Sequence, residues 1–293
     1  MTELRVAIVT GAGNGLGRAE ATLLAGQGYA VIVNDIGASP DGTGRSTSAA
    51  DAVVRQIREA GGVALANYDS VAEEAGAEAI VRCALDAFGR IDALVNNAGV
   101  IRSGLLTDLD PSAWDLLIKT HLYGTYYCTR AASAVMTAQG HGRIVCTSSH
   151  VGLGANGHSA YSAAKEGITG FARSVARELR DHGITCNVIR PVAAWRGHPS
   201  DDPVRRQLIP DDIAALVGFL VSESAGNVSG CVFEVWHGHV GIFRDPPPVE
   251  QVVVKDGTWT CEELARLLPD TLTRGRSLHS FPHSQPPWLS SIE

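Results

Sequence analysis

Residues 5–17 read Arg-Val-Ala-Ile-Val-Thr-Gly-Ala-Gly-Asn-Gly-Leu-Gly, and this stretch decides the fold. The short apolar run predicts a strand, and the glycines after it lead directly into a helical pattern. Glycines in such a turn let the backbone approach a pyrophosphate, whose charge then lies at the N-terminus of the helix. The loop therefore predicts dinucleotide binding, with contacts expected from Gly11, Asn14, Gly15, Leu16 and Gly17.

The alternation of strand and helix continues to about residue 236. We predict strands at 5–9, 30–35, 63–67, 92–96, 143–148, 184–189 and 231–235. Helical patterns lie between them, at 15–27, 46–60, 72–88, 112–139, 159–182 and 210–222. This order predicts an α/β fold, a three-layer, Rossmann-like, doubly wound parallel sheet of about seven strands. We expect 1–240 to form one domain, 241–276 an extension packed on it, and 277–293 a partly disordered tail.

The composition is that of an ordinary globular protein, with 45% hydrophobic and 19% charged residues. The formal net charge of -7 argues against a nucleic-acid partner, and no apolar run reaches the length of a membrane span. The six cysteines are scattered without a Cys-x-x-Cys pair, so we expect free thiols and a cytoplasmic location. No cysteine or carboxylate pattern accompanies His237, His239, His279 and His283, so no metal site is expected.

Polar residues follow three of the predicted strands. Asp35 ends the second strand, where a carboxylate accepts hydrogen bonds from the adenosine ribose and repels a 2′-phosphate, so we expect NAD rather than NADP. The alternative is that Asp35 only caps the loop that follows. Asp69, with Ser70 beside it, follows the third strand and either binds the adenine amino group or caps the helix predicted at 72. The fourth strand runs into Asn97-Ala98-Gly99, small and polar residues that let a cofactor pass close to the backbone.

A tyrosine and a lysine stand four residues apart, at Tyr161 and Lys165, on one face of a predicted helix. A free tyrosine titrates near ~10, which is too high for a proton acceptor at neutral pH. An ammonium group beside the phenol favours the phenolate, so we expect Lys165 to lower the pKa of Tyr161. The same spacing also occurs by chance in surface helices. The pair therefore indicates a catalytic role only in combination with the motifs that precede it.

Three of these motifs together resemble the short-chain dehydrogenase/reductase family. They are Thr-Gly-x-x-x-Gly-x-Gly at 10–17, Asn-Asn-Ala-Gly at 96–99 and Tyr-x-x-x-Lys at 161–165, and the resemblance covers roughly residues 4–240. The stretches at 33–37, 66–71, 121–124 and 233–235 are more specifically similar to the (R)-3-hydroxyacyl-CoA dehydrogenase region of peroxisomal-type multifunctional β-oxidation enzymes and to its bacterial stand-alone relatives. The extension at 241–276 is similar to that subgroup too.

The resemblance implies a catalytic serine before the tyrosine, and two serines compete for the position. Counting back thirteen residues from Tyr161, the usual family spacing, gives Ser148. Counting forward from the end of the fifth strand gives Ser149, with one residue missing from the loop that follows. We prefer Ser149, because the strand fixes which hydroxyl faces the cleft and loops absorb deletions easily.

A fourth family position, usually Asn, holds His121 here, as in the closer subgroup. Its implied role is to hold a water that relays protons to Lys165; the alternative is a core histidine satisfied by a backbone carbonyl. After the sixth strand the family often has Pro-Gly, whereas this chain keeps Pro191 without the glycine. We expect Pro191 to contact the cofactor, 195–209 to form a substrate lid, and plain solvated charges, rather than CoA contacts, at Arg196, Arg205 and Arg206.

The implied reaction interconverts a secondary alcohol and a ketone by hydride transfer to NAD, with a 3-hydroxyacyl-CoA as the expected substrate. Ser149 orients the substrate oxygen, Tyr161 removes its proton, and Lys165 binds the nicotinamide ribose. A hydroxysteroid or polyketide ketoreductase is the alternative, and a cofactor-sensing protein without turnover the more distant one. Family members pair through the helices at 112–139 and 159–182, so a homodimer or homotetramer is expected, with Ala172, Val175 and Ala176 as exposed candidates.

Overall fold

The computed structural model describes residues 4–193, 208–244 and 246–275. Its strands are β1 (Val6–Thr10), β2 (Ala30–Asn34), β3 (Val63–Asn67), β4 (Ala93–Asn96), β5 (Gly142–Thr147), β6 (Ile184–Pro191), β7 (Val232–Trp236) and β8 (His239–Ile242). They form one sheet in the order β3-β2-β1-β4-β5-β6-β7-β8, which confirms the predicted doubly wound α/β fold. All neighbouring pairs are parallel except β7 and β8.

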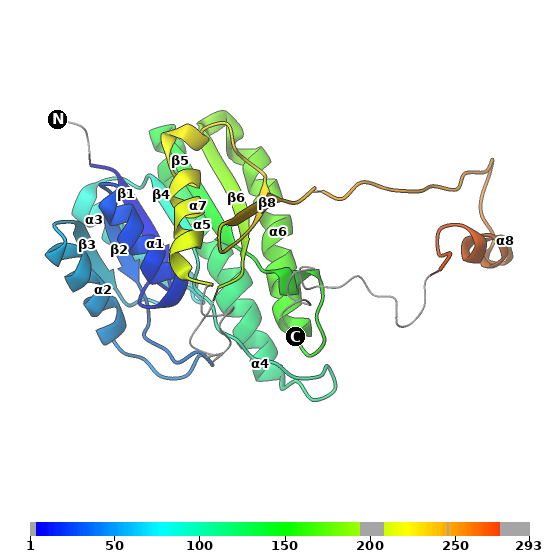
Figure 1. Cartoon of the computed structure of the whole chain (residues 1–293), viewed down its shortest axis with the longest axis horizontal. Coiled ribbons are helices and arrows are strands. Elements are labelled where there is room, and N and C mark those ends of the chain that lie inside the picture. The colour runs from blue at the N-terminus through cyan, green and yellow to red at the C-terminus, as the bar shows by residue number, and fades with distance from the viewer. Residues whose placement is uncertain (1–3, 194–207, 245, 276–293) are drawn as a thin grey trace.

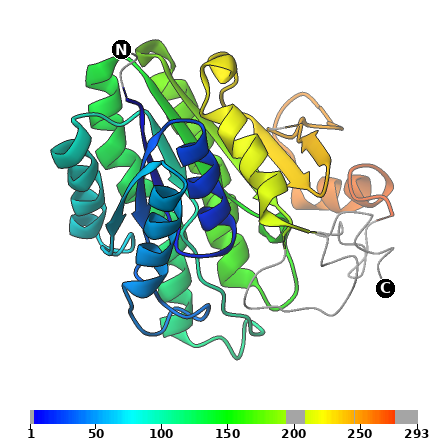
Figure 2. The ribbon, with the colours of Figure 1, turned by 60° about the vertical axis from the view of Figure 1, so that its left-hand side comes forward.

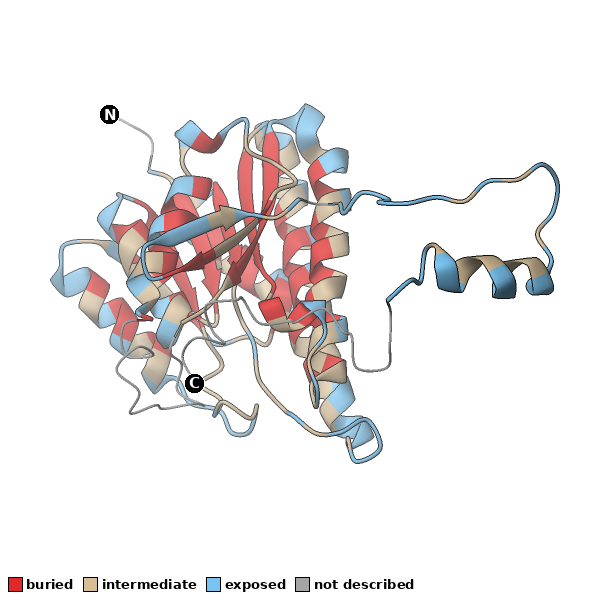
Figure 3. Cartoon of the chain, turned by 45° about the vertical axis from the view of Figure 1, so that its right-hand side comes forward, coloured by how far each residue is buried: buried red, intermediate tan, exposed pale blue. Residues whose placement is uncertain are grey.

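Helices cover both faces of the sheet (Figure 1, Figure 2). Those on one face are α3 (Glu74–Phe88), α5 (Gly124–Gln139) and α6 (Ser159–Leu179), and those on the other are α1 (Gly15–Gly26), α2 (Ser48–Glu59) and α7 (Pro210–Leu220). Side chains of β1 alternate between the two hydrophobic cores: Val6 and Ile8 face one, Ala7 and Val9 the other. Burial on both faces explains why the strands read as unbroken apolar runs (Figure 3).

The eighth strand is the main departure from the prediction. β8 pairs antiparallel with β7 across a two-residue turn, and the turn residues His237 and Gly238 have φ values of 20° and 71°. Two positive φ values in succession are typical of the tight turns that join hairpin strands. The run from His239 to Ile242 is short and largely exposed, so it lacks the buried apolar pattern by which the other strands were predicted.

The helix predicted at 112–139 is divided. It consists of α4 (Pro111–Leu117), a π-helical segment η1 (Ile118–Tyr123) and α5. Asp110 caps α4 by accepting a hydrogen bond from the Ser112 N–H at 2.7 Å. Single turns of π-helix inside a longer helix are frequently found at functional sites, and this one carries His121.

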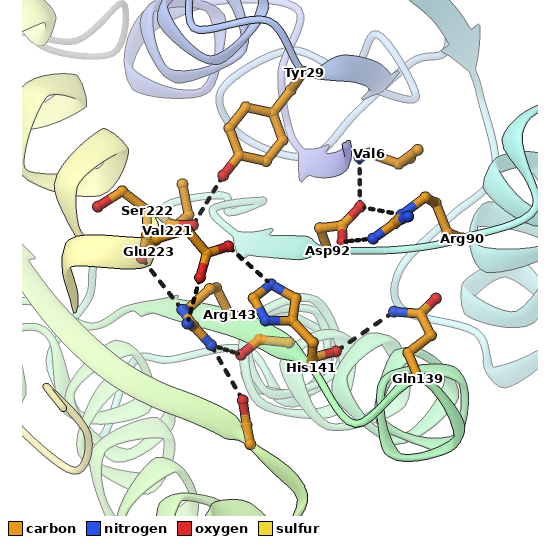
Figure 4. A network of polar contacts seen from close by, with 12 residues as sticks. Val6, Tyr29, Arg90, Asp92, Gln139, His141, Arg143, Val221, Ser222 and Glu223 are labelled. Carbon is orange, nitrogen blue, oxygen red and sulfur yellow. Dashed lines mark hydrogen bonds and ion pairs between the residues drawn. The ribbon is translucent and has the colours of Figure 1, made fainter. Parts of the chain in front are cut away.

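Polar side chains tie the strands together at the amino-terminal edge of the sheet (Figure 4). The buried Asp92 accepts a hydrogen bond from the Val6 N–H at 2.8 Å and pairs with Arg90 at 2.7 Å. Nearby, His141 Nε2 lies 3.8 Å from Glu223 Oε1. These contacts lie at the opposite end of the strands from the loops that follow them, and their role is structural.

Three alanine and valine positions predicted to be exposed are buried instead. Ala172, Val175 and Ala176 of α6 are 1%, 7% and 6% exposed and belong to the core against the sheet, so this part of the oligomer prediction is wrong. The oligomeric state itself stays a prediction. Within the described residues, no helix is long and apolar enough to cross a membrane.

Strand β8 crosses the predicted boundary between the domain and the extension at residues 240 and 241. Beyond β8 the extension continues away from the sheet as a largely exposed chain to α8 (Cys261–Leu267) (Figure 1). No residue of α8 is buried. Packing of this outer part on the domain stays a prediction. The predicted tail, and Arg196, Arg205 and Arg206 of the predicted lid, lie outside the described residues.

Candidate active site

A cavity of about 650 Å³ lies at the carboxyl ends of the strands, where the chain order reverses between β1 and β4. This switch point is where open α/β sheets bind their ligands. The cavity is lined by every residue predicted for the site except one: Gly11, Asn14, Gly15, Leu16, Asp35, Asp69, Ser70, Asn97, Ala98, Gly99, His121, Ser149, Tyr161, Lys165 and Pro191. The exception, Gly17, lies below the loop, where a Cβ would come within 2.4 Å of the Asn97 side chain and of the Gly11 carbonyl.

The glycine loop is fastened to the end of β4. Thr10 Oγ1 accepts hydrogen bonds from the N–H groups of Asn97 and Ala98, both at 3.1 Å, and Asn97 Nδ2 donates to the Thr10 carbonyl at 2.9 Å. Gly11 has a φ of 64°, and a Cβ there would lie 2.7 Å from Ala98 Cα. Only glycine therefore permits this close approach of the two loops, which leaves the first N–H groups of α1 directed at the cavity.

Asp35 closes the other side of the loop. Its Oδ2 accepts from the Gly13 N–H at 2.8 Å, and its Oδ1 accepts from the Gly37 N–H at 2.7 Å. A Cβ on Gly13 would lie 2.7 Å from Oδ2, so the carboxylate sits directly against the loop. A carboxylate has about four lone-pair positions, so two hydrogen bonds leave it able to accept more.

Asp69 does not cap a helix, so one of its two predicted roles is wrong. Helix α3 begins at Glu74 with Glu73 as its N-cap. Asp69 Oδ2 instead accepts from Asn67 Nδ2 at 2.7 Å, and the Asp69 carbonyl accepts from Asn34 Nδ2 at 2.9 Å. The helix starts later than predicted because residues 70–73 form a turn, in which Ser70 Oγ accepts from the Ala72 N–H at 3.3 Å.

The two candidate serines point in different directions. Ser148 is 2% exposed, and its hydroxyl donates to the Lys165 carbonyl at 2.8 Å and lies 3.1 Å from Thr169 Oγ1. The Ser149 hydroxyl instead lies beside the phenol of Tyr161 and lowers its pKa. Its hydroxyl also accepts from the Val151 N–H at 3.1 Å, which caps the short helix η2 (His150–Leu153). The hydroxyl next to the phenol is thus that of Ser149.

Tyr161 and Lys165 lie on the first turns of α6, as predicted. Their pKa values, however, are not shifted as expected. Lys165 Nζ donates to the Thr147 carbonyl at 2.6 Å and lies 5.5 Å from the centroid of the Tyr161 ring. Burial raises the pKa of Tyr161 to about 12, although the Ser149 hydroxyl lowers it, and burial lowers the pKa of Lys165 to about 7. The predicted lowering of the tyrosine pKa by the lysine is therefore wrong for this arrangement.

His121 lies beneath the same phenol. Its ring meets the Tyr161 ring edge-on, with centroids 5.1 Å apart, and its Nε2 lies 2.7 Å from the Val100 carbonyl. That contact is the one expected of a core histidine. Its Nδ1 is buried without a hydrogen-bond partner among the described residues. Burial, and next the nearby Lys165, hold the pKa of His121 well below its usual range, so the ring is neutral at pH 7.

One wall of the cavity was not predicted. The loop between β2 and α2 lines it with Ser39, Pro40, Gly42 and Arg45, among others, and the Ile101 N–H donates to the Pro40 carbonyl at 3.1 Å. Gly42 and Gly44 have φ values of 85° and 79°. The glycines in this stretch were the available sequence signal for this loop. They predict a turn, but they do not indicate that the turn folds against the cavity.

Comparisons with known proteins agree with this geometry. The family model for short chain dehydrogenases matches residues 5–194. The mouse peroxisomal multifunctional enzyme type 2 is 46% identical over 82% of this chain, which spans 32% of that protein. A (2S)-[(R)-hydroxy(phenyl)methyl]succinyl-CoA dehydrogenase subunit of Thauera aromatica is 37% identical over 80% of this chain and 96% of its own length.

A solved structure supports the same assignment. The crystal structure of a short chain dehydrogenase from Mycobacterium avium superposes with a TM-score of 0.83 at 36% identity, covering 93% of this chain and 96% of that one. The matched segment includes the glycine loop, the Asn-Asn-Ala-Gly turn, and the tyrosine and lysine of α6. The chain is therefore an oxidoreductase of the short-chain dehydrogenase family.

Proposed function

We propose that this enzyme interconverts a secondary alcohol and a ketone with NAD as hydride carrier, and that its substrate is a 3-hydroxyacyl-CoA. One observation carries the proposal: Ser149, Tyr161 and Lys165 meet at one end of the cavity whose other end is bounded by Asp35 and the glycine loop. An elongated dinucleotide that spans the cavity from Asp35 to Tyr161 brings its redox-active ring to the phenol.

The residues present fit an NAD molecule. Gly11 and Gly13 lack the Cβ atoms that would fill the turn, and the open N–H groups of the first turn of α1 suit a pyrophosphate. In this proposal Asp35 binds the adenosine ribose, Asp69 and Ser70 bind the adenine, and Asn97 to Gly99 and Pro191 contact the rest of the molecule; all of them line the cavity. When bound, NAD accepts or returns the hydride and contributes a positively charged ring in its oxidised form.

In this proposal Tyr161 holds the transferred proton. Its hydroxyl takes the proton of the substrate alcohol during oxidation and returns it during reduction, while Ser149 holds the substrate oxygen. Burial favours the protonated phenol, so a positive charge on the cavity side is needed to favour the phenolate. Lys165 contributes by binding the nicotinamide ribose. His121 offers a buried, unpartnered Nδ1 to a relay water.

The preference for NAD is tested at Asp35. We expect Asp35→Asn to lower kcat/KM for NAD by about 10- to 100-fold, since hydrogen bonds to a charged group contribute about 1.5–3 kcal/mol. Removal of the carboxylate also removes its repulsion of a 2′-phosphate, so turnover with NADP should rise. The matched control is Asp41→Asn in the following loop, whose carboxylate accepts a hydrogen bond from Thr43 Oγ1 at 2.7 Å. An unchanged NAD-to-NADP ratio in Asp35→Asn would contradict the role of this carboxylate.

The proposed substrate class rests on similarity to other proteins. A relative that spans nearly the same length is named as a CoA-thioester dehydrogenase, and the stretches at 33–37, 66–71 and 121–124 resemble the hydroxyacyl-CoA subgroup. A hydroxysteroid or polyketide ketoreductase remains the alternative. Assays of the purified protein with NAD and a panel of 3-hydroxyacyl-CoAs and hydroxysteroids separate the two. Turnover of the steroids alone would replace the CoA proposal, and absence of turnover with every alcohol would favour a cofactor-sensing role.

A further inference from the structure

The residue next to Ser149 is a buried histidine. His150 is 7% exposed, lines the cavity and begins the short helix η2, which the Ser149 hydroxyl caps. Its ring packs between Trp236 and Phe243, with centroids 6.1 and 5.7 Å away. A shift of this ring would move the turn that presents the Ser149 hydroxyl to Tyr161.

Glu234 of β7 lies next to this histidine. His150 Nε2 lies 3.6 Å from Glu234 Oε2 and is buried without a closer hydrogen-bond partner among the described residues. The other oxygen, Glu234 Oε1, lies 2.9 Å from Nε2 of His239 on β8. The carboxylate therefore joins the hairpin of β7 and β8 to the turn that carries Ser149.

The same cluster reaches the helix of Tyr161 and Lys165. The Arg190 guanidinium lies 4.8 Å from the centroid of the Phe243 ring and donates to Glu166 Oε2 at 2.8 Å. Glu166 follows Lys165 directly, and a Cβ on Gly152 of η2 would come within 3.3 Å of its Oε2. Burial lowers the pKa of His150, Glu234 raises it, and Arg190 and His239 lower it further, so the ring is neutral at pH 7.

We propose that His150, which packs against Phe243 beside Glu234, is a positioning residue for Ser149, and that the β7–β8 hairpin belongs to the active site through this cluster. Glu234 and Phe243 lie beyond residue 194, where the match to the family model ends. The histidine touches neither proton nor hydride in the reaction. Its effect is to fix where the Ser149 hydroxyl stands relative to Tyr161, so the inference rests on the proposed dehydrogenase activity.

The test compares His150→Ala with His150→Gln on any secondary alcohol that the wild-type enzyme oxidises. We expect His150→Ala to lower kcat by up to about 100-fold, the scale of a 1 Å misplacement of a catalytic group. NADH affinity, measured by fluorescence titration, should stay within about twofold because the glycine loop and Asp35 are untouched. Displacement of the Ser149 hydroxyl should also move the rise of kcat to higher pH, because that hydroxyl lowers the pKa of Tyr161. His150→Gln keeps an N–H donor of similar reach. This variant should therefore restore most of the kcat and most of the wild-type pH profile.

The matched control is His141→Ala. His141 also pairs with a glutamate, Glu223 at 3.8 Å, but at the amino-terminal edge of the sheet (Figure 4). Its loss should lower the melting temperature without moving the pH profile. Equal effects of the two alanine variants on kcat, or a His150→Ala enzyme with wild-type kcat and pH profile, would overturn the positioning role. Where His150→Ala does not fold, Glu234→Gln replaces it with the same expectations. Failure of the wild type on every alcohol would instead refute the proposed function.

Discussion

Replacement of Tyr161 by phenylalanine is expected to lower kcat by about two to four orders of magnitude and to leave cofactor binding intact. Phenylalanine keeps the ring that meets His121 edge-on at 5.1 Å, so the packing of α6 is preserved. What is lost is the hydroxyl that lies beside Ser149 and, in the proposed mechanism, exchanges the substrate proton. Proton transfer by a positioned side chain contributes about 10²- to 10⁴-fold to a rate, and kcat should fall by that amount.

The measurement is a steady-state assay together with an NADH fluorescence titration. Tyr126→Phe is the matched control, because Tyr126 lies on α5 and packs edge-on against Phe171, with centroids 6.0 Å apart, outside the cavity lining. Its kcat should equal that of the wild type. Oxidation by the wild type should also accelerate as pH rises toward the pKa of the phenol, which burial raises. Substantial turnover by Tyr161→Phe would remove the tyrosine from its proposed role.

Much of this site was predictable because its residues follow the ends of strands. In a parallel sheet all carboxyl ends lie at one edge, so Gly11, Asp35 and Asn97, which are far apart in sequence, converge on one cavity. The helical spacing of Tyr161 and Lys165 fixes their relative position in the same way. Local pattern and sheet topology therefore suffice for these residues, and the structure brings them together as the sequence indicates.

The remaining features depend on tertiary contacts that have no local pattern. The choice between Ser148 and Ser149 depends on which hydroxyl meets Lys165 and Thr169 and which meets Tyr161. The pKa of Tyr161 depends on how completely the phenol is buried, which spacing along a helix does not reveal. Strand β8 forms because the turn at Gly238 brings a short exposed run back along β7, and only the partner strand makes it a strand.

A buried carboxylate on α1 was likewise not predicted. Glu20 is 0% exposed, and both of its oxygens lack a hydrogen-bond partner among the described residues. By helical spacing it shares a face with Leu23 and Gln27, whose side chains a Cβ on Gly218 of α7 would meet, so it lies toward the interface of the two helices. Burial raises the pKa of Glu20 to about 8, and the side chain is therefore largely protonated at pH 7.

This shift makes stability depend on pH. Between pH 4.5, the ordinary value, and about 8, the folded protein holds a proton on Glu20 that the unfolded chain has released. The free energy of unfolding must therefore fall as pH rises through this window and level off above it. At about 1.4 kcal/mol for each pH unit, the loss amounts to roughly 5 kcal/mol as an upper value.

Glu20→Gln should remove that loss, since glutamine has nearly the same shape and stays neutral. We expect equal melting temperatures for variant and wild type near pH 5. At higher pH the melting temperature of the variant should exceed that of the wild type by a difference that grows to about 10 °C at pH 8, since each kcal/mol of stability corresponds to about 2 °C. Thermal unfolding followed by circular dichroism across pH 5–8 measures the difference. Glu78→Gln, on the exposed face of α3, is the control and should leave the curve unchanged. Parallel curves for Glu20→Gln and wild type would mean that Glu20 is ionised in the folded protein, and that its burial is satisfied in some other way.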